Sequence, residues 1–176
     1  MINNKTKKLV ISALMLSIGL ILPLLTSQIK EIGDSILPMH LPVMLCGIIC
    51  GGYYGAGVGF IMPFLRSVIF TMPPIYPNAV WMAFELATYG LVIGLIYNSR
   101  KNKSIKHLYL SIVCSMVCGR IVWGIVKLIL LSIKGNAFTF TAFITGGFID
   151  AIPGIIIQLI LIPIIISITE RYSNVN

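Results

Sequence analysis

The fold is decided by the first long apolar stretch, LVISALMLSIGLILPLLTSQI, which occupies residues 9–29 and contains no Asp, Glu, Lys or Arg. A helix needs about 20 apolar residues to cross the hydrocarbon core of a bilayer. The stretch therefore predicts a transmembrane helix, which Pro23 kinks or ends in its outer part. It is too long for a cleavable signal peptide, and no small-residue cleavage site follows it.

The rest of the chain has the same apolar character. Of its 176 residues, 57% are hydrophobic and only 10% are charged, and the mean hydropathy is +0.98. Ordinary soluble domains carry roughly a quarter charged residues, so a soluble fold is excluded. The length allows about six membrane crossings and leaves no room for a soluble catalytic domain. We predict one all-α integral membrane domain over residues 1–176.

The apolar runs and their breaks predict six transmembrane helices, at residues 9–29, 39–51, 53–72, 77–98, 107–133 and 141–169. The second break falls at Gly51-Gly52, and Met72-Pro73-Pro74 ends the third helix. With the N-terminus inside, eight Lys and Arg residues lie at cytoplasmic ends, against Lys30 and Lys134 in outer loops. This positive-inside bias places both termini in the cytoplasm.

Five ionisable residues fall inside the predicted helices, where a charge costs at least ~2.5–3.5 kcal/mol. By the helical rise, four of them share one layer in the outer half, ~9–14 Å below the outer helix ends: Arg66, Glu85, Lys127 and Asp150. Arg120 lies nearer the middle, on the same helix face as Lys127. We predict a polar pocket that opens to the outside and orients a hydrophilic ligand. The alternative is a pair of buried ion pairs, for instance Arg66 with Glu85, that fix the helix register.

Aromatic residues join this layer by helical spacing. Asn78, Met82 and Glu85 share one helix face with Trp81 beside them, and Trp123 lies one turn from Lys127. Aromatic rings with a few convergent polar groups form small-molecule pockets, although each Trp alone is equally typical of an interfacial belt. The candidate substrate-binding residues are Arg66, Asn78, Trp81, Glu85, Arg120, Trp123, Lys127 and Asp150. His40 is predicted to be an interfacial hydrogen-bonding residue and not a metal ligand.

Small residues indicate how the helices pack. Glycines recur every four residues across the break between the second and third helices, which permits close backbone approach: Gly47, Gly51, Gly55 and Gly59. Ala13 and Ser17 give the first helix a small-residue face for internal packing or for a partner helix. Two cysteine pairs at i,i+4 spacing are predicted to be packing residues and not a disulfide or zinc site: Cys46, Cys50, Cys114 and Cys118.

Motifs for catalysis or self-powered transport are missing from the sequence. It has no GxxxxGK[ST] phosphate loop, no HExxH, no GxSxG and no close Asp cluster. Without repeat symmetry, a carrier built from inverted halves is also disfavoured. A small membrane protein with a predicted pocket and no energy source suggests one subunit of a larger assembly.

The chain resembles the substrate-binding S components of energy-coupling factor (ECF) vitamin importers over nearly its whole length. The resemblance rests on the size, on six helices with both termini inside, on the glycine-rich second and third helices, on HLPV at residues 40–43, and on ALMLS at residues 13–17. The last motif is similar to the small-residue motif through which S components dock, except that Ser17 replaces the usual Ala.

This resemblance implies a binding subunit of the bacterial plasma membrane that is not an enzyme and needs no cofactor. Its partners would be a vitamin ligand, a transmembrane coupling subunit that docks on Ala13 and Ser17, and two ATPase subunits, with no nucleic acid. Loops 27–38, 72–76 and 134–141 would lie near the pocket. The HLPV motif is somewhat similar to pantothenate-type members, while other B vitamins and queuosine precursors stay open. The alternatives are a small membrane enzyme that uses Glu85 or Asp150 as acid or base, and a structural or channel-forming oligomer.

Overall fold

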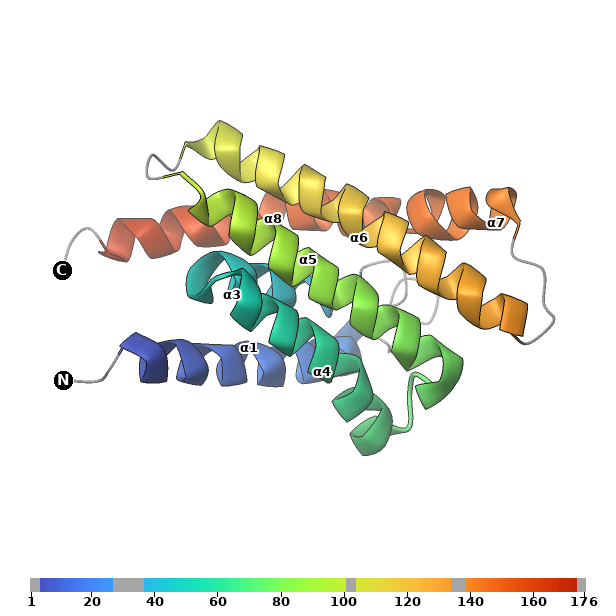
Figure 1. The fold of residues 1–176 in the computed structure, drawn as a ribbon. Coiled ribbons are helices and arrows are strands. Elements are labelled where there is room, and N and C mark those ends of the chain that lie inside the picture. The colour runs from blue at the N-terminus through green and yellow to red at the C-terminus, as the bar shows by residue number, and fades with distance from the viewer. Residues whose placement is uncertain (1–3, 27–36, 101–103, 134–138, 174–176) are drawn as a thin grey trace.

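A computed structural model describes residues 4–26, 37–100, 104–133 and 139–173 of the chain, and all regular elements in these ranges are helices (Figure 1). The long elements are α1 (Asn4–Thr26), α3 (His40–Cys50), α4 (Gly52–Phe70), α5 (Val80–Asn98), α6 (Ile105–Ile133) and α8 (Ile152–Ser173). A π-helical turn, η1 (Ile75–Ala79), leads into α5. Before α8 lie the short α7 (Phe140–Ile144) and a second π-helical turn, η2 (Thr145–Ile149).

The predicted all-helical membrane fold with six helices is confirmed. Five helical segments are long and apolar enough to cross a bilayer: Asn4–Leu24, Gly52–Phe70, Ile75–Asn98, Ile105–Ile133 and Phe140–Thr169. The sixth helix, α3, has 11 residues and therefore rises only ~16 Å, about half the thickness of the hydrocarbon core. Almost all of α3 is buried, so it lies inside the bundle among the longer helices.

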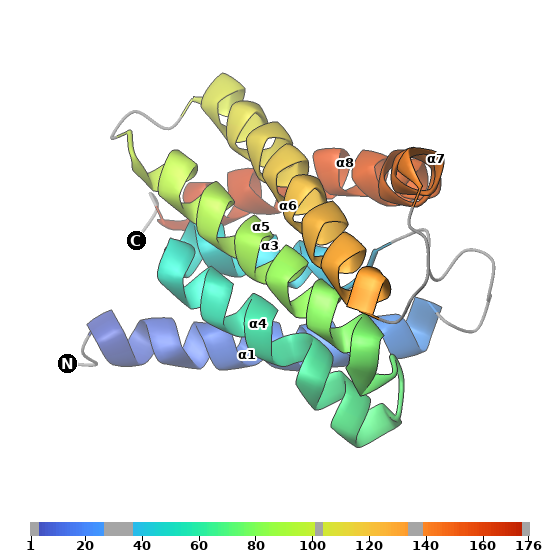
Figure 2. The ribbon, with the colours of Figure 1, turned by 45° about the vertical axis from the view of Figure 1, so that its right-hand side comes forward.

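The helices form two layers. α4, α5 and α6 lie side by side in one layer, and α1, α3 and α8 make up the other (Figures 1 and 2). α3 lies at the centre, where it contacts α1, α4, α5 and α8. The first turn of α1 and the last turn of α8 lie at the same end of the molecule (Figure 1). This placement agrees with the predicted topology, in which both termini lie on one side of the membrane.

Glycines let α3, α4 and α5 approach at backbone distance, as their spacing predicted. A Cβ built on Gly59 would lie 2.5 Å from the carbonyl carbon and oxygen of Leu86 on α5. One built on Gly55 would lie 2.6 Å from the Cα of Gly47 and 2.9 Å from the carbonyl oxygen of Gly90. Gly51 has a different role, because its φ of 109° forms the break between α3 and α4, a conformation that L side chains rarely adopt.

Gly59→Ala is expected to destabilise the protein by about 1–3 kcal/mol, because the new methyl group meets backbone atoms that cannot rotate away. Gly57→Ala is the matched control on the same helix, since nothing lies within 4 Å of a Cβ at that position. There the better helix propensity of Ala should raise the stability slightly. Unfolding of both variants by titration with SDS in mixed micelles checks this prediction. Equal stability of the two variants would show that α4 and α5 are not in backbone contact.

The C-terminal helix is interrupted, which the prediction of one helix over residues 141–169 did not include. The α-helical hydrogen bonding changes to a π-helical turn at Thr145–Ile149, and α8 begins only at Ile152. Two features of the sequence explain the interruption. Gly146 and Gly147 are poor helix formers, and Pro153 lacks the amide hydrogen that a continuous helix would need there, whereas it fits the first turn of a new helix.

The four cysteines are free thiols, as predicted. Cys46 and Cys50 are fully buried, and the thiol of Cys46 lies 3.5 Å from Oγ of Ser12 on α1. Both cysteines belong to a buried cluster that also holds Val43, Val58 and Met62. Packing of small side chains between α1 and α3 therefore accounts for Cys46 and Cys50.

Candidate substrate-binding site

The candidate site lies where one face of α5 meets one face of α6. Trp81, Glu85 and Tyr89 recur every four residues on α5, and Arg120, Trp123 and Lys127 recur at three and four residues on α6. Residues at these spacings share a helix face. Because α5 and α6 pack against each other, the two rows meet at one interface.

A buried ion pair occupies the centre of this interface. Nη1 of Arg120 donates to Oε1 of Glu85 at 2.9 Å, and Nε2 of His40 on α3 lies 3.4 Å from the same oxygen. The three residues are only 3–4% exposed. The His40 ring packs edge-on against Tyr89, with a centroid distance of 4.9 Å. Desolvation offsets much of the attraction in a buried pair, so the hydrogen bonds and packing around Glu85 are part of what stabilises it.

The structure corrects one alternative and one prediction about this network. Arg66 does not pair with Glu85, because its Nε donates instead to the carbonyl oxygen of Met72, 3.1 Å away. His40 is not interfacial, because it begins α3, which is buried in the bundle. Helix order explains both outcomes: α5 packs between α4 and α6, and Glu85 is directed towards α6 and α3.

Lys127 lies beside both tryptophans of the chain. Its Nζ is 4.4 Å from the ring centroid of Trp123 and 5.1 Å from that of Trp81. The guanidinium carbon of Arg120 is 5.9 Å from the Trp123 ring. Cations within about 6 Å of an aromatic face are attracted to it, most strongly by Trp. Both tryptophans therefore face the charged side chains of the bundle, and an interfacial lipid belt is not needed to explain them.

The short helix α7 and the turn η2, which follow α6 in the sequence, pack against Trp123. The Phe143 ring of α7 lies 6.1 Å from the Trp123 ring. Gly147 of η2 also packs closely, since a Cβ there would lie 3.3 Å from Trp123. The interruption before α8 thus places a glycine where a larger side chain would press on the tryptophan.

The remaining residues of the predicted layer are Asn78, Met82 and Asp150. Asn78 is half-buried in η1, just before α5, and Met82 is half-buried one turn from it. Asp150 is exposed after η2 and has no ion pair within the described ranges. Of the three loops expected near the pocket, 72–76 is described, whereas 27–36 and 134–138 lie outside the described residues.

The list of candidate site residues predicted from the sequence lacks three buried side chains. His40 and Tyr89 complete the network around Glu85, and helical spacing from Glu85 was the available signal for Tyr89. Gln158 of α8 is 2% exposed, and its Nε2 has no hydrogen-bond partner in the part of the chain that the structure describes. The sequence could have indicated Gln158, because it is the one amide side chain in the apolar run 152–169. No three His, Cys, Asp or Glu side chains of the described ranges are placed to hold a metal ion.

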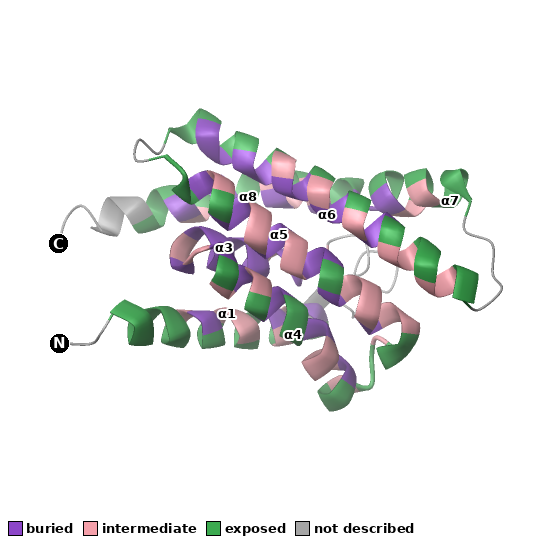
Figure 3. Cartoon of the chain, viewed as in Figure 1, coloured by how far each residue is buried: buried purple, intermediate pink, exposed green. Residues whose placement is uncertain are grey.

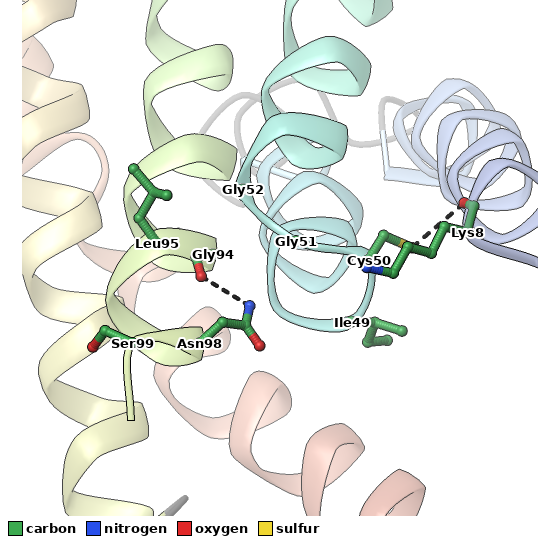
Figure 4. A pocket seen from close by; sticks show the side chains of 9 residues that line it. All are labelled: Lys8, Ile49, Cys50, Gly51, Gly52, Gly94, Leu95, Asn98 and Ser99. Atoms are coloured by element: carbon green, nitrogen blue, oxygen red, sulfur yellow. Dashed lines mark hydrogen bonds between the residues drawn. The ribbon is translucent and has the colours of Figure 1, made fainter. Parts of the chain in front are cut away.

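A separate hollow of about 350 Å³ lies where α1, α3, α4 and α5 meet, beside the break between α3 and α4 (Figure 4). Glycines form much of its wall, and the polar side chains beside them are already bonded. Nδ2 of Asn98 donates to the carbonyl oxygen of Gly94 at 2.8 Å. The thiol of Cys50 lies 3.6 Å from the carbonyl oxygen of Lys8. Its lining residues are Lys8, Ile49, Cys50, Gly51, Gly52, Gly94, Leu95, Asn98 and Ser99. This hollow follows from glycine packing. None of Glu85, Arg120 and Lys127 lines it.

Together, the fold and the site define a small helical membrane protein with a buried polar and aromatic cluster between its helices. A family model described as the substrate-specific component of ECF transporters matches residues 7–166, and the chain therefore belongs to this family. No curated protein and no solved structure matches the chain.

Family membership settles several expectations. The chain is a transport subunit and not an enzyme, so the acid–base alternative for Glu85 and Asp150 is excluded. It is a multi-pass protein of the plasma membrane, where it associates with an ECF energy-coupling module and a substrate.

Proposed function

We propose that this S component captures a small, water-soluble vitamin or related micronutrient from the outside, in a site between the outer halves of α5 and α6. The proposed contact residues are Trp81, Trp123, Lys127 and Arg120, with Asn78 at the outer rim. Glu85 and His40 hold Arg120 in place from beneath. Arg66 and Asp150 are left out, because Arg66 bonds to the 72–76 loop and Asp150 is exposed and has no ion pair among the described residues.

The observation that supports this site best is the position of Lys127 against two indole rings. A half-buried ammonium between aromatic faces, with an ion pair below it, combines apolar walls with a fixed positive charge. Small-molecule sites have this composition: mostly apolar and aromatic lining with a few placed polar groups. Charges inside a membrane domain are costly and are generally kept for function.

We further propose that α1 docks on the transmembrane coupling subunit through Ala13 and Ser17, with ATP hydrolysis on separate subunits. Ala13 and Ser17 are both exposed, and Oγ of Ser17 is bonded back to the carbonyl oxygen of Ala13 at 3.0 Å, so its polar group is already satisfied. The exposed side of α1 is visible in Figure 3. Small residues on an exposed helix face permit close approach of a second helix.

Pantothenate is the first ligand to test. The motif at residues 40–43 resembles pantothenate-type members, and pantothenate combines a carboxylate with hydroxyl and amide groups that Lys127, Arg120 and Asn78 would bind. Other B vitamins and queuosine precursors belong in the same binding screen.

Lys127→Met is expected to weaken ligand binding about 10- to 100-fold, the value of one charge-assisted contact, while expression stays unchanged. Trp81 and Trp123 are the only two tryptophans and both contact Lys127. Ligand binding should therefore change the intrinsic fluorescence of the purified protein, which supplies the titration signal. Lys106→Met is the matched control, because Lys106 is an exposed lysine near the start of the same helix. Unchanged affinity in Lys127→Met would remove this residue from the site.

A further inference from the structure

The guanidinium group of Arg120 has one edge that no described residue uses. Its Nη1 donates to Glu85, but Nε and Nη2 are buried and have no hydrogen-bond partner in the described parts of the chain. Nε and Nη2 lie on the same side of the planar group, and their N–H bonds point in nearly the same direction. Such an edge fits the two oxygens of a carboxylate, with two parallel hydrogen bonds.

If Arg120 had only a structural role, leaving Nε and Nη2 without an acceptor would cost free energy of folding. Buried donors nearly always have a partner, and the penalty is larger when the group is charged. Arg120 is 4% exposed, in the middle of α6, where an apolar side chain would be the cheaper choice for packing. The ion pair with Glu85 needs only Nη1. The other two donors indicate that Arg120 binds a further acceptor.

The surroundings of Arg120 suggest how such a ligand would lie. Arg120, Trp123 and Lys127 follow one another along one face of α6, and both cations lie within 6 Å of the Trp123 ring. Seven residues of helix separate Arg120 from Lys127, a rise of about 10 Å. A ligand with its acid group at Arg120 would therefore extend along Trp123, with its opposite end near Lys127 and Trp81.

Resting on the proposed function, we infer that the substrate is a small carboxylic acid whose carboxylate is bound by Nε and Nη2 of Arg120. Glu85 acts as a positioning residue, because its bond to Nη1 fixes the plane of the guanidinium and leaves the opposite edge for the ligand. Arg120 then determines specificity: it selects acids against their neutral analogues and against cationic vitamins.

Matched pairs of compounds test this inference on the unmodified protein. Tryptophan fluorescence titrations would compare pantothenate with panthenol, nicotinate with nicotinamide, and biotin with biotin methyl ester. In the pair that binds, the acid is expected to bind about 10- to 100-fold more tightly than its neutral partner. Equal affinity within that pair would overturn the inference. This comparison needs no variant, so it holds even where a substitution of Arg120 prevents folding.

Arg120→Lys then tests the residue itself. Lysine keeps the charge for Glu85 but lacks the two-donor edge, so the preference for the acid should fall at least about tenfold while the neutral partner binds as before. Arg100→Lys, the same change at an exposed position, should leave the preference intact. An unchanged preference in Arg120→Lys would overturn the assignment. Tight binding of thiamine or pyridoxine alone would overturn the inference and leave the proposed function standing. Binding of none of these compounds, of the other B vitamins or of queuosine precursors would count against both.

Discussion

Glu85→Ala is expected to lower the free energy of unfolding by about 3–5 kcal/mol, because removing one partner of a buried ion pair leaves the other charge uncompensated. Arg120 would lose its acceptor at 2.9 Å, and His40 would lose its contact at 3.4 Å. Both residues are buried, with His40 3% and Arg120 4% exposed, so bulk water compensates little for the lost partner. SDS titration in mixed micelles, followed by far-UV circular dichroism, measures the change.

Glu85→Gln is the matched control for this prediction. The amide keeps an oxygen that accepts from Arg120 and differs little in size, so the loss should be smaller, about 1–3 kcal/mol. If Glu85→Ala unfolds at the same SDS fraction as the wild-type protein, the described ion pair does not contribute to the fold. A larger loss in the glutamine variant than in the alanine variant would contradict the geometry of the network.

Ala13→Trp is expected to abolish uptake in cells while leaving ligand affinity unchanged. Ala13 is exposed on α1, away from the α5–α6 interface, so an indole there does not touch the proposed site. It would, however, hold a partner helix away from a face that small side chains leave open. Uptake of the labelled ligand in cells that also express the coupling module measures transport, and fluorescence titration of the purified variant measures binding.

Ile18→Trp provides the control for that experiment. Ile18 is also exposed on α1 but lies about 140° around the helix axis from Ala13. Uptake should persist in this variant if docking uses the Ala13–Ser17 face. Normal uptake in both variants would show that docking does not use this face, and loss of binding in Ala13→Trp would show that α1 is coupled to the ligand site.

Much of the fold was predictable because apolar runs and helix breakers are local signals. The runs without charges give the long helices, and Met72-Pro73-Pro74 follows the end of α4. The break before α8 was also present in the sequence, at Gly146-Gly147 and Pro153, although the strongly apolar residues around it masked it. The short α3 was harder to interpret, since a run of apolar residues looks the same in a helix that its neighbours bury and in one that faces lipid.

The site was predictable only in part. Depth along each helix places Glu85 and Lys127 in one predicted layer, but depth does not say which helices are neighbours. Arg66 and Arg120 were both possible partners of Glu85 until the packing of α5 against α6 was known. His40 was placed at the surface because it precedes an apolar run, whereas the surrounding helices bury that run and its first residue.

Mass spectrometry of the small molecules that co-purify with the protein tests the central claim most directly. The account predicts that one small, polar compound purifies with the wild-type protein and is lost from Lys127→Met at an unchanged yield of protein. Retention of the compound by both proteins, or recovery of lipid alone from both, would contradict a nutrient site between α5 and α6.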